Sequence, residues 1–112
     1  MSISFEGSGQ WAVTFLCEDV EEGEVVKLNS TGKAVSCAAG DAFCGVVLTV
    51  GRDGGACATA LGGMVKTAFS GTAPTLGWAG LSADGKGGVK ADSDGRSYLV
   101  VAADGKTVTF VL

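Results

Sequence analysis

Apolar and polar positions in this chain alternate with a period of two, in short runs bounded by glycine or Asp-Gly. This period is typical of β-strands with one buried face. No 11-residue window keeps an apolar stripe at helical spacing. We therefore predict an all-β fold with little or no helix, a small barrel or a sandwich. The expected strands are 11–17, 24–28, 33–37, 43–50, 56–61, 64–69, 78–82, 88–91, 97–102 and 106–112.

The segments between these runs predict turns and loops. Asp53-Gly54 and Asp104-Gly105 give the best hairpin signals, because Asp-Gly supplies the left-handed backbone that tight primed turns require. The acid-rich segment 18–24 is expected to be a loop. Residues 72–76 either link two halves of the chain or form one helical turn.

The second half of the chain repeats the first, with a segment at about 20–61 matched by one at about 77–112. Gly40 and Phe43 correspond to Gly95 and Tyr98, and the pair 46–47 corresponds to 100–101. The offset is 53 to 55 residues at first and 51 after the hairpin turn, because the second turn is shorter. Such drift within loops is typical of an internal duplication, so two quasi-repeated β-hairpin units are predicted.

The length of 112 residues is that of a single domain, for which we assign residues 11–112. Residues 1–10 are small and polar without a sustained period. They are predicted to form a flexible N-terminal arm, either disordered or docked on a partner. Much of the apolar content is alanine and valine, so the core should consist of thin β-branched layers.

The formal charge is −4, from 12 acidic and 8 basic residues, and the basic residues are not grouped. Nucleic acid is therefore not an expected partner, since phosphate neutralisation needs clustered lysine and arginine. A membrane is not an expected partner either, because no stretch approaches the ~20 apolar residues of a membrane span. The five acids in 18–24 are interpreted as a solvated loop, and attraction of a cation or a basic surface is the alternative.

The four cysteines are Cys17, Cys37, Cys44 and Cys57, and their spacing forms no Cys-x-x-Cys pair. Two disulfides would suit a secreted protein, but the first residues show no signal-peptide pattern. We interpret the cysteines as reduced, buried, small hydrophobic residues.

The chain has no histidine, which removes the commonest general base and metal ligand. The segment 80–86 satisfies most of a phosphate-loop pattern, but Gly87 stands where a magnesium-binding hydroxyl belongs. A turn at Asp84 and Gly85 is the better interpretation. The segment 92–95 resembles part of a calcium loop, yet Lys90 would occupy its first ligand position, which favours an Asx-turn. We expect no catalytic, cofactor-binding or metal-ligating residue.

Four large aromatic residues, Trp11, Phe15, Trp78 and Phe110, are predicted to lie in the core or at a subunit interface. The alternative for the exposed members is a platform on which sugars stack. Asn29 begins a formal glycosylation acceptor, which has no meaning without export.

One order of motifs runs through most of the chain. Gly-x-x-Val lies within 23–28, Gly-Lys follows at 32–33, Gly-Asp-x-Phe-x-Gly-Val-Val spans 40–47, and Pro-Thr-Leu-Gly spans 74–77. With its Gly-rich hairpin turn, this pattern, over about 20–112, resembles the small head-decoration or capsid cement proteins of tailed bacteriophages and prophages. Four cysteines are more than the resemblance leads us to expect.

The resemblance implies a non-enzymatic, β-rich structural virion protein that assembles as a homotrimer. It would be made in the bacterial host cytoplasm and sit on the capsid exterior, where subunits of the major capsid protein meet, clamping them against the pressure of packaged DNA. In such proteins the N-terminal segment often orders on the capsid, which fits an arm at 1–10.

Two other hypotheses stay open. The chain could be a small binding module of a surface or secreted assembly, with Trp11 or Trp78 recognising carbohydrate or a protein ligand. It could also be a small enzyme or an accessory subunit, which the missing histidine disfavours.

Overall fold

The computed structural model describes residues 10–112, so almost all of the predicted arm at 1–10 lies outside the described residues. The described chain is all-β, as predicted, and it holds no helix that could span a membrane. Its nine strands are β1 (Gln10–Glu18), β2 (Val25–Leu28), β3 (Ala34–Ser36), β4 (Gly45–Val50), β5 (Ala56–Ser70), β6 (Gly77–Ala83), β7 (Val89–Ala91), β8 (Arg96–Ala103) and β9 (Thr107–Val111).

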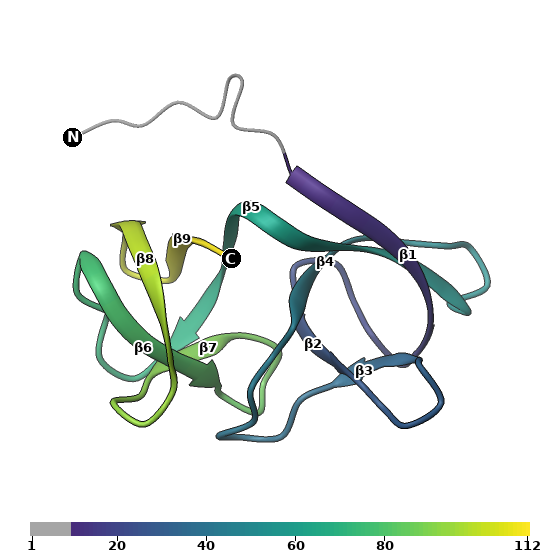
Figure 1. The fold of residues 1–112 in the computed structure, drawn as a ribbon, viewed down its shortest axis with the longest axis horizontal. Coiled ribbons are helices and arrows are strands. Elements are labelled where there is room, and N and C mark those ends of the chain that lie inside the picture. The colour runs from purple at the N-terminus through teal and green to yellow at the C-terminus, as the bar shows by residue number, and fades with distance from the viewer. Residues whose placement is uncertain (1–9) are drawn as a thin grey trace.

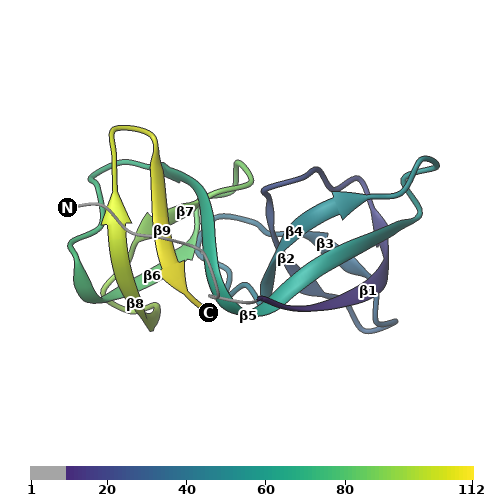
Figure 2. The same ribbon diagram turned by 90° about the horizontal axis from the view of Figure 1, so that it is seen from above.

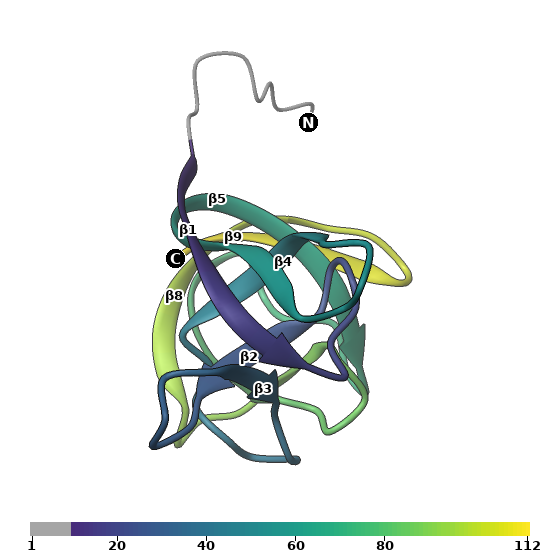
Figure 3. The same ribbon diagram turned by 90° about the vertical axis from the view of Figure 1, so that its right-hand side faces the viewer.

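The first lobe is a closed five-stranded barrel, here called barrel A. Its strands follow the order β1-β3-β2-β4-β5, and the first half of β5 pairs back with β1 to close the ring. All pairings are antiparallel except that of β1 with β3. Figure 3 views the molecule from the barrel A side, with β1 crossing in front.

The second lobe, barrel B, has the same arrangement. The second half of β5 pairs in parallel with β7, and the ring continues through β6, β8 and β9 back to β5. The two barrels lie side by side and β5 runs through both (Figure 1). The view from above shows the same division (Figure 2). Each sheet therefore closes on itself, which removes the long unpaired edges of an open sheet.

A single strand, β5, replaces two of the expected strands. The runs 56–61 and 64–69 were expected to be separate because Gly62 and Gly63 lie between them, but β5 continues through both glycines. Gly63 has φ of 88°, in the left-handed region that glycine adopts without steric cost. The glycines therefore let β5 bend from one barrel into the next without ending the strand.

The strand registers show how far the two halves correspond. Cys17 of β1 pairs with Ala34 of β3, as Phe69 of β5 pairs with Val89 of β7. The second half of β5 is thus the counterpart of β1, although neither segment falls within the sequence repeats at 20–61 and 77–112. The strands after the two hairpin turns keep the offset of 51 residues, because Cys57 corresponds to Val108. Cys57 pairs with Val50 in barrel A, and Val108 pairs with Ala103 in barrel B.

One detail of the sequence repeat is corrected by a pair of β-bulges. The β4–β5 register shifts between Val47 and Thr49, and the β8–β9 register shifts between Val100 and Ala102. The bulges show that Val47 corresponds to Val100. The sequence repeat had instead matched Val46 with Val100 and Val47 with Val101. Valines occupy adjacent positions in both strands, so the residues alone did not distinguish a slip of one position.

The two predicted hairpins both form, but of the two Asp-Gly pairs only Gly54 has the left-handed backbone that was predicted, and neither Asp53 nor Asp104 has it. Gly54 has φ of 73°, whereas Gly105 is not in the left-handed region. The side chain of Asp104 holds the second turn instead. Its carboxylate accepts hydrogen bonds from the Lys106 amide at 2.8 Å and the Thr107 amide at 2.7 Å. These bonds hold the pKa of Asp104 down at about 2.

The two barrels have separate cores. The barrel A core is a cluster of small side chains: Cys17, Val20, Val26, Ala34, Val47 and Cys57. The larger cluster fills barrel B and extends into the contact between the barrels: Val25, Cys37, Phe43, Val46, Ala60, Val65, Leu81, Ala83, Val89, Tyr98, Val100, Val108 and Phe110. The expected thin layers of β-branched residues thus describe barrel A better than barrel B.

Three aromatic rings join the barrels. Phe43, from the segment before β4, stacks on Tyr98 of β8 with ring centroids 5.2 Å apart. Phe110 of β9 meets both rings edge-on. The backbone of the same segment pairs with β6, because the Gly40 amide donates to the Ala83 carbonyl at 2.8 Å. Phe43 and Tyr98 are corresponding residues of the two sequence repeats, and they meet at the junction.

Candidate functional site

The four aromatic residues singled out from the sequence have different surroundings. Phe110 is fully buried in the core, and Phe15 packs half-buried against the barrel A core. Trp11 and Trp78 are not core residues, because 67% and 74% of their surface is exposed. Strand alternation shows which residues share a face but not whether that face is covered, and barrel closure leaves both tryptophans outside.

Trp78 begins a line of apolar side chains across the outside of barrel B. It pairs with Leu99 on β8, Leu99 pairs with Val111 on β9, and Val111 pairs with Met64 on β5. Directly paired residues place their side chains on the same face of a sheet. The neighbours of these residues in sequence, such as Val65, Val100 and Phe110, point into the core. We call Trp78, Leu99, Val111 and Met64 the apolar band.

The apolar band borders a shallow hollow of about 220 Å³. Arg96 and Ser97 line the hollow together with Trp78, Leu99 and Val111. The Arg96 guanidinium lies over the Tyr98 ring, 5.1 Å from its centroid, and this contact fixes a positive charge beside the band. Leu76, two residues before Trp78, is 61% exposed and adds apolar surface at the same end of β6.

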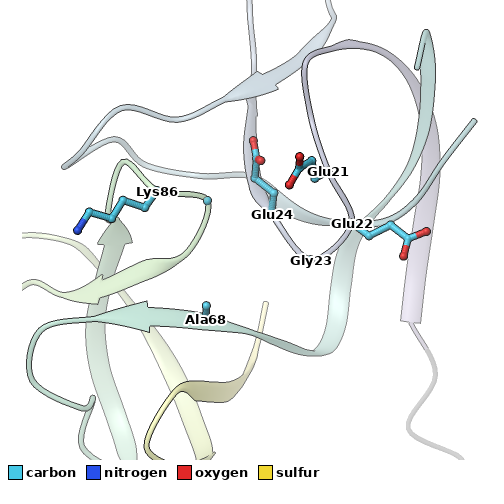
Figure 4. Close-up of a pocket in the computed structure, with 7 residues that line it drawn as sticks. Glu21, Glu22, Gly23, Glu24, Ala68 and Lys86 are labelled. Carbon is cyan, nitrogen blue, oxygen red and sulfur yellow. The ribbon is translucent and has the colours of Figure 1, made fainter. Parts of the chain in front are cut away.

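A second hollow, the junction pocket, lies where the barrels meet. Its volume is about 170 Å³, and it is lined by Glu21, Glu22, Gly23, Glu24, Ala68, Lys86 and Gly87. Figure 4 shows the Lys86 amine directed away from the three glutamates, and the Glu22 carboxylate directed away from the other two. Among residues 10–112, no three Asp, Glu, Cys or His side chains are grouped as a metal site.

Hydrogen bonds within the chain hold the acidic loop at the junction pocket. The Thr67 hydroxyl donates to the Gly23 carbonyl at 2.7 Å, and the Val25 amide donates to the Gly87 carbonyl at 2.9 Å. The Ser36 hydroxyl donates to the Glu24 carboxylate. The first two bonds tie the loop of barrel A to barrel B, so the predicted solvated loop also joins the two lobes.

The phosphate-loop segment and the calcium-loop segment both form Asx-turns, which confirms the turn interpretation. Asp84 accepts hydrogen bonds from the amides of Lys86 and Gly88, and strand β7 follows rather than a helix. Asp92 accepts from the Asp94 amide at 2.9 Å and from the Ser82 hydroxyl at 2.8 Å. Both carboxylates are therefore occupied by bonds within their own turn or strand pair.

All four cysteines carry free thiols, and three are buried as expected. Cys44 is exposed because it directly follows Phe43 in an extended segment and points to the opposite side. Burial raises the pKa of Cys37 to about 11, and burial with the neighbouring Cys57 raises that of Cys17 to about 11. At pH 7, about one such thiol in ten thousand is ionised, so neither is an activated nucleophile.

The apolar band with Arg96 is therefore the surface that sequence reasoning did not find as a unit. Trp78 was noted in the sequence, but Leu99, Val111 and Met64 come together only through strand register. The sequence signal that could have revealed this surface is Trp78, which lies on one face of a predicted strand whose opposite face is also apolar.

In comparisons with known proteins, no family model matches this chain and no curated protein matches it.

Proposed function

We propose that this chain is a non-enzymatic structural protein that decorates and stabilises a phage-like capsid from outside, as a homotrimer. The observation that carries the proposal is the outward-facing apolar band, in which Trp78 is 74% exposed, on a barrel that is otherwise closed and well packed. Apolar surface gathered on the outside of a packed domain often marks an interaction site. The resemblance of residues 20–112 to head-decoration proteins supplies the kind of partner, the major capsid protein.

The double barrel suits a clamping role. A protein that holds neighbouring shell subunits together must transmit force without unfolding, and closed barrels present no strand edge that peels away easily. A homotrimer attaches through three equivalent contacts, which raises avidity without a tight single site. The net charge of −4 agrees with a position outside the shell, away from DNA.

Two measurements test this proposal. Light scattering at several concentrations, with reductant present, should give the mass of three chains. Cosedimentation with undecorated heads of tailed phages should then show saturable binding. A chain that stays monomeric at every concentration and fails to bind any head in the panel would contradict the proposal.

A carbohydrate-binding module is the second candidate, favoured by the surroundings of Trp78. An exposed indole next to hydrogen-bonding side chains, here Arg96 and Ser97, provides a stacking surface with polar contacts at its rim. Titration with a panel of oligosaccharides, monitored by Trp78 fluorescence in a Trp11→Phe background, tests it. Saturable quenching by a sugar would support this candidate, and no response at millimolar sugar would exclude it for the panel.

A further inference from the structure

We propose that the apolar band of one copy docks on barrel A of a second copy, on the outward face of β1 around Leu16, here called the Leu16 surface. Three such contacts would close a ring. The inference rests on the proposed homotrimer and names the two surfaces that build it. It follows from the exposed apolar side chains and the charges beside them, and the proposed homotrimer supplies the number of copies.

Trp78 is the exposed anchor of the apolar band. A tryptophan side chain buries about 150–250 Å² in a core or interface, and 74% of Trp78 is exposed. Leu99, Val111 and Met64 are half-buried and extend the same surface across three more strands. Stable interfaces bury about 800 Å² on each partner, with a few aromatic anchors at the centre. The band has the composition of such a centre.

Barrel A carries a complementary surface on β1. Leu16 is 64% exposed and shares the outward face of β1 with Glu18, two residues further along. Glu18 pairs with Lys33 at 2.7 Å, and four further acids follow it in the acidic run 18–24. Leu16 therefore lies beside the acidic run of barrel A, whereas the apolar band lies beside basic side chains.

The charges beside the apolar band are basic. Lys66 is exposed on the outward face of β5, two residues from Met64, and Arg96 lines the hollow beside Trp78. Within residues 10–112, neither side chain forms a salt bridge. Barrel A (10–61) holds seven acidic and three basic residues, a net charge of −4, and barrel B (62–112) holds four and five, a net charge of +1. Contact between unlike barrels is therefore favoured over contact between two copies of barrel A.

The number of copies comes from the proposed homotrimer. Two different patches that meet can form a heterologous contact, and repeated heterologous contacts form a closed ring when the rotation closes. A two-fold dimer could make the same contact twice across its axis, and its mass of two chains would distinguish it from the ring. In a ring of three copies, barrel B of each copy meets barrel A of the next.

Light scattering of three single variants tests the inference. Trp78→Ser and Leu16→Ser should each raise the trimer dissociation constant by at least tenfold and shift the mass toward one chain. Leu28→Ser is the matched control, because Leu28 is also an exposed leucine of barrel A (44%) but lies on β2. It should leave the trimer intact. Circular dichroism of each variant verifies that the barrels are folded.

A charge variant makes the test independent of folding defects. Lys66→Glu should also weaken the trimer by about tenfold, and high salt should weaken the wild-type trimer, because the contact joins opposite charges. Retention of the trimer by both Trp78→Ser and Leu16→Ser would overturn this inference while leaving the homotrimer in place. A wild-type chain that is monomeric throughout would overturn the homotrimer as well.

Discussion

Barrel A and barrel B share one strand order but fill it differently. Barrel B holds Phe110, Leu81 and Tyr98, whereas the buried cluster of barrel A contains nothing larger than valine. Buried hydroxyls do not separate the two barrels, because barrel A buries Thr59 and barrel B buries Thr67, Ser82 and Thr109. The two copies of one topology therefore differ in how much apolar area stabilises each of them.

The outer surfaces of the two barrels also differ. Barrel A carries most of the negative charge, and barrel B carries the apolar band with a slight positive charge. A duplicated fold in which both halves kept the same surface would expose the same patch twice. Divergence of the surfaces instead gives a molecule with two unlike faces, which is what a heterologous contact requires. The core of barrel B and the surface contrast between the barrels are therefore separate properties, and substitutions can test each of them.

The largest expected effect comes from the barrel B core. Phe110→Ala should lower the free energy of unfolding by about 3–5 kcal/mol, because it leaves a cavity next to both Phe43 and Tyr98. Val47→Ala in barrel A should lower it by about 1–2 kcal/mol, since fewer buried carbons are lost. Urea unfolding of both variants measures the difference. Equal losses would show that the two cores contribute alike.

A smaller effect is expected where the turn between β7 and β8 approaches a glycine of β6 in barrel B. A Cβ at Gly80 would clash with the carbonyl of Asp92, whose amide donates to the Gly80 carbonyl at 3.0 Å. Gly80→Ala should therefore cost about 1–3 kcal/mol of stability. Gly105→Ala is the control, because a Cβ there meets no atom within 4 Å and the backbone is not left-handed. A thermal melt compares the two, and similar melting temperatures would refute the clash.

The sequence predicted the strands and hairpin turns of both barrels, which depend on local chemistry. Alternation located nearly every strand, and the turn residues located both hairpins, because these depend on neighbouring residues only. The correspondence of β1 with the end of β5 was not found, since Cys17 matches Phe69 and their strands share few residue types. The apolar band was not found either, because it depends on the register of four strands, which distant parts of the chain determine.

Alkaline pH should destabilise barrel A through Cys17. Its folded pKa of about 11 lies above the ordinary value near 9. Its contribution is fully present below pH 9 and is lost as the pH rises toward about 11, since the unfolded chain ionises first. Between pH 8 and pH 10 the wild type should lose about 1 kcal/mol more stability than Cys17→Ala. Urea midpoints at both pH values measure this, and parallel losses in the two proteins would rule it out.

The smallest effect concerns a turn that the two barrels build with different residues. Asn29 in barrel A accepts hydrogen bonds from the Thr31 and Lys33 amides, both at 3.0 Å. Asp84 in barrel B accepts from the Lys86 and Gly88 amides at 2.7 and 3.0 Å. An amide oxygen and a carboxylate oxygen accept the same hydrogen bonds in an Asx-turn. Asp84→Asn should therefore change the free energy of unfolding by less than about 0.5 kcal/mol.

Asp84→Ala provides the contrast for this last prediction. It removes both amide contacts and the bond from the Ser70 hydroxyl at 2.6 Å, and should cost about 1–2 kcal/mol. Urea unfolding of both variants at pH 7 makes the measurement. If Asp84→Asn cost as much as Asp84→Ala, the negative charge itself would stabilise the turn, and the two barrels would differ in their turns as well as in their cores.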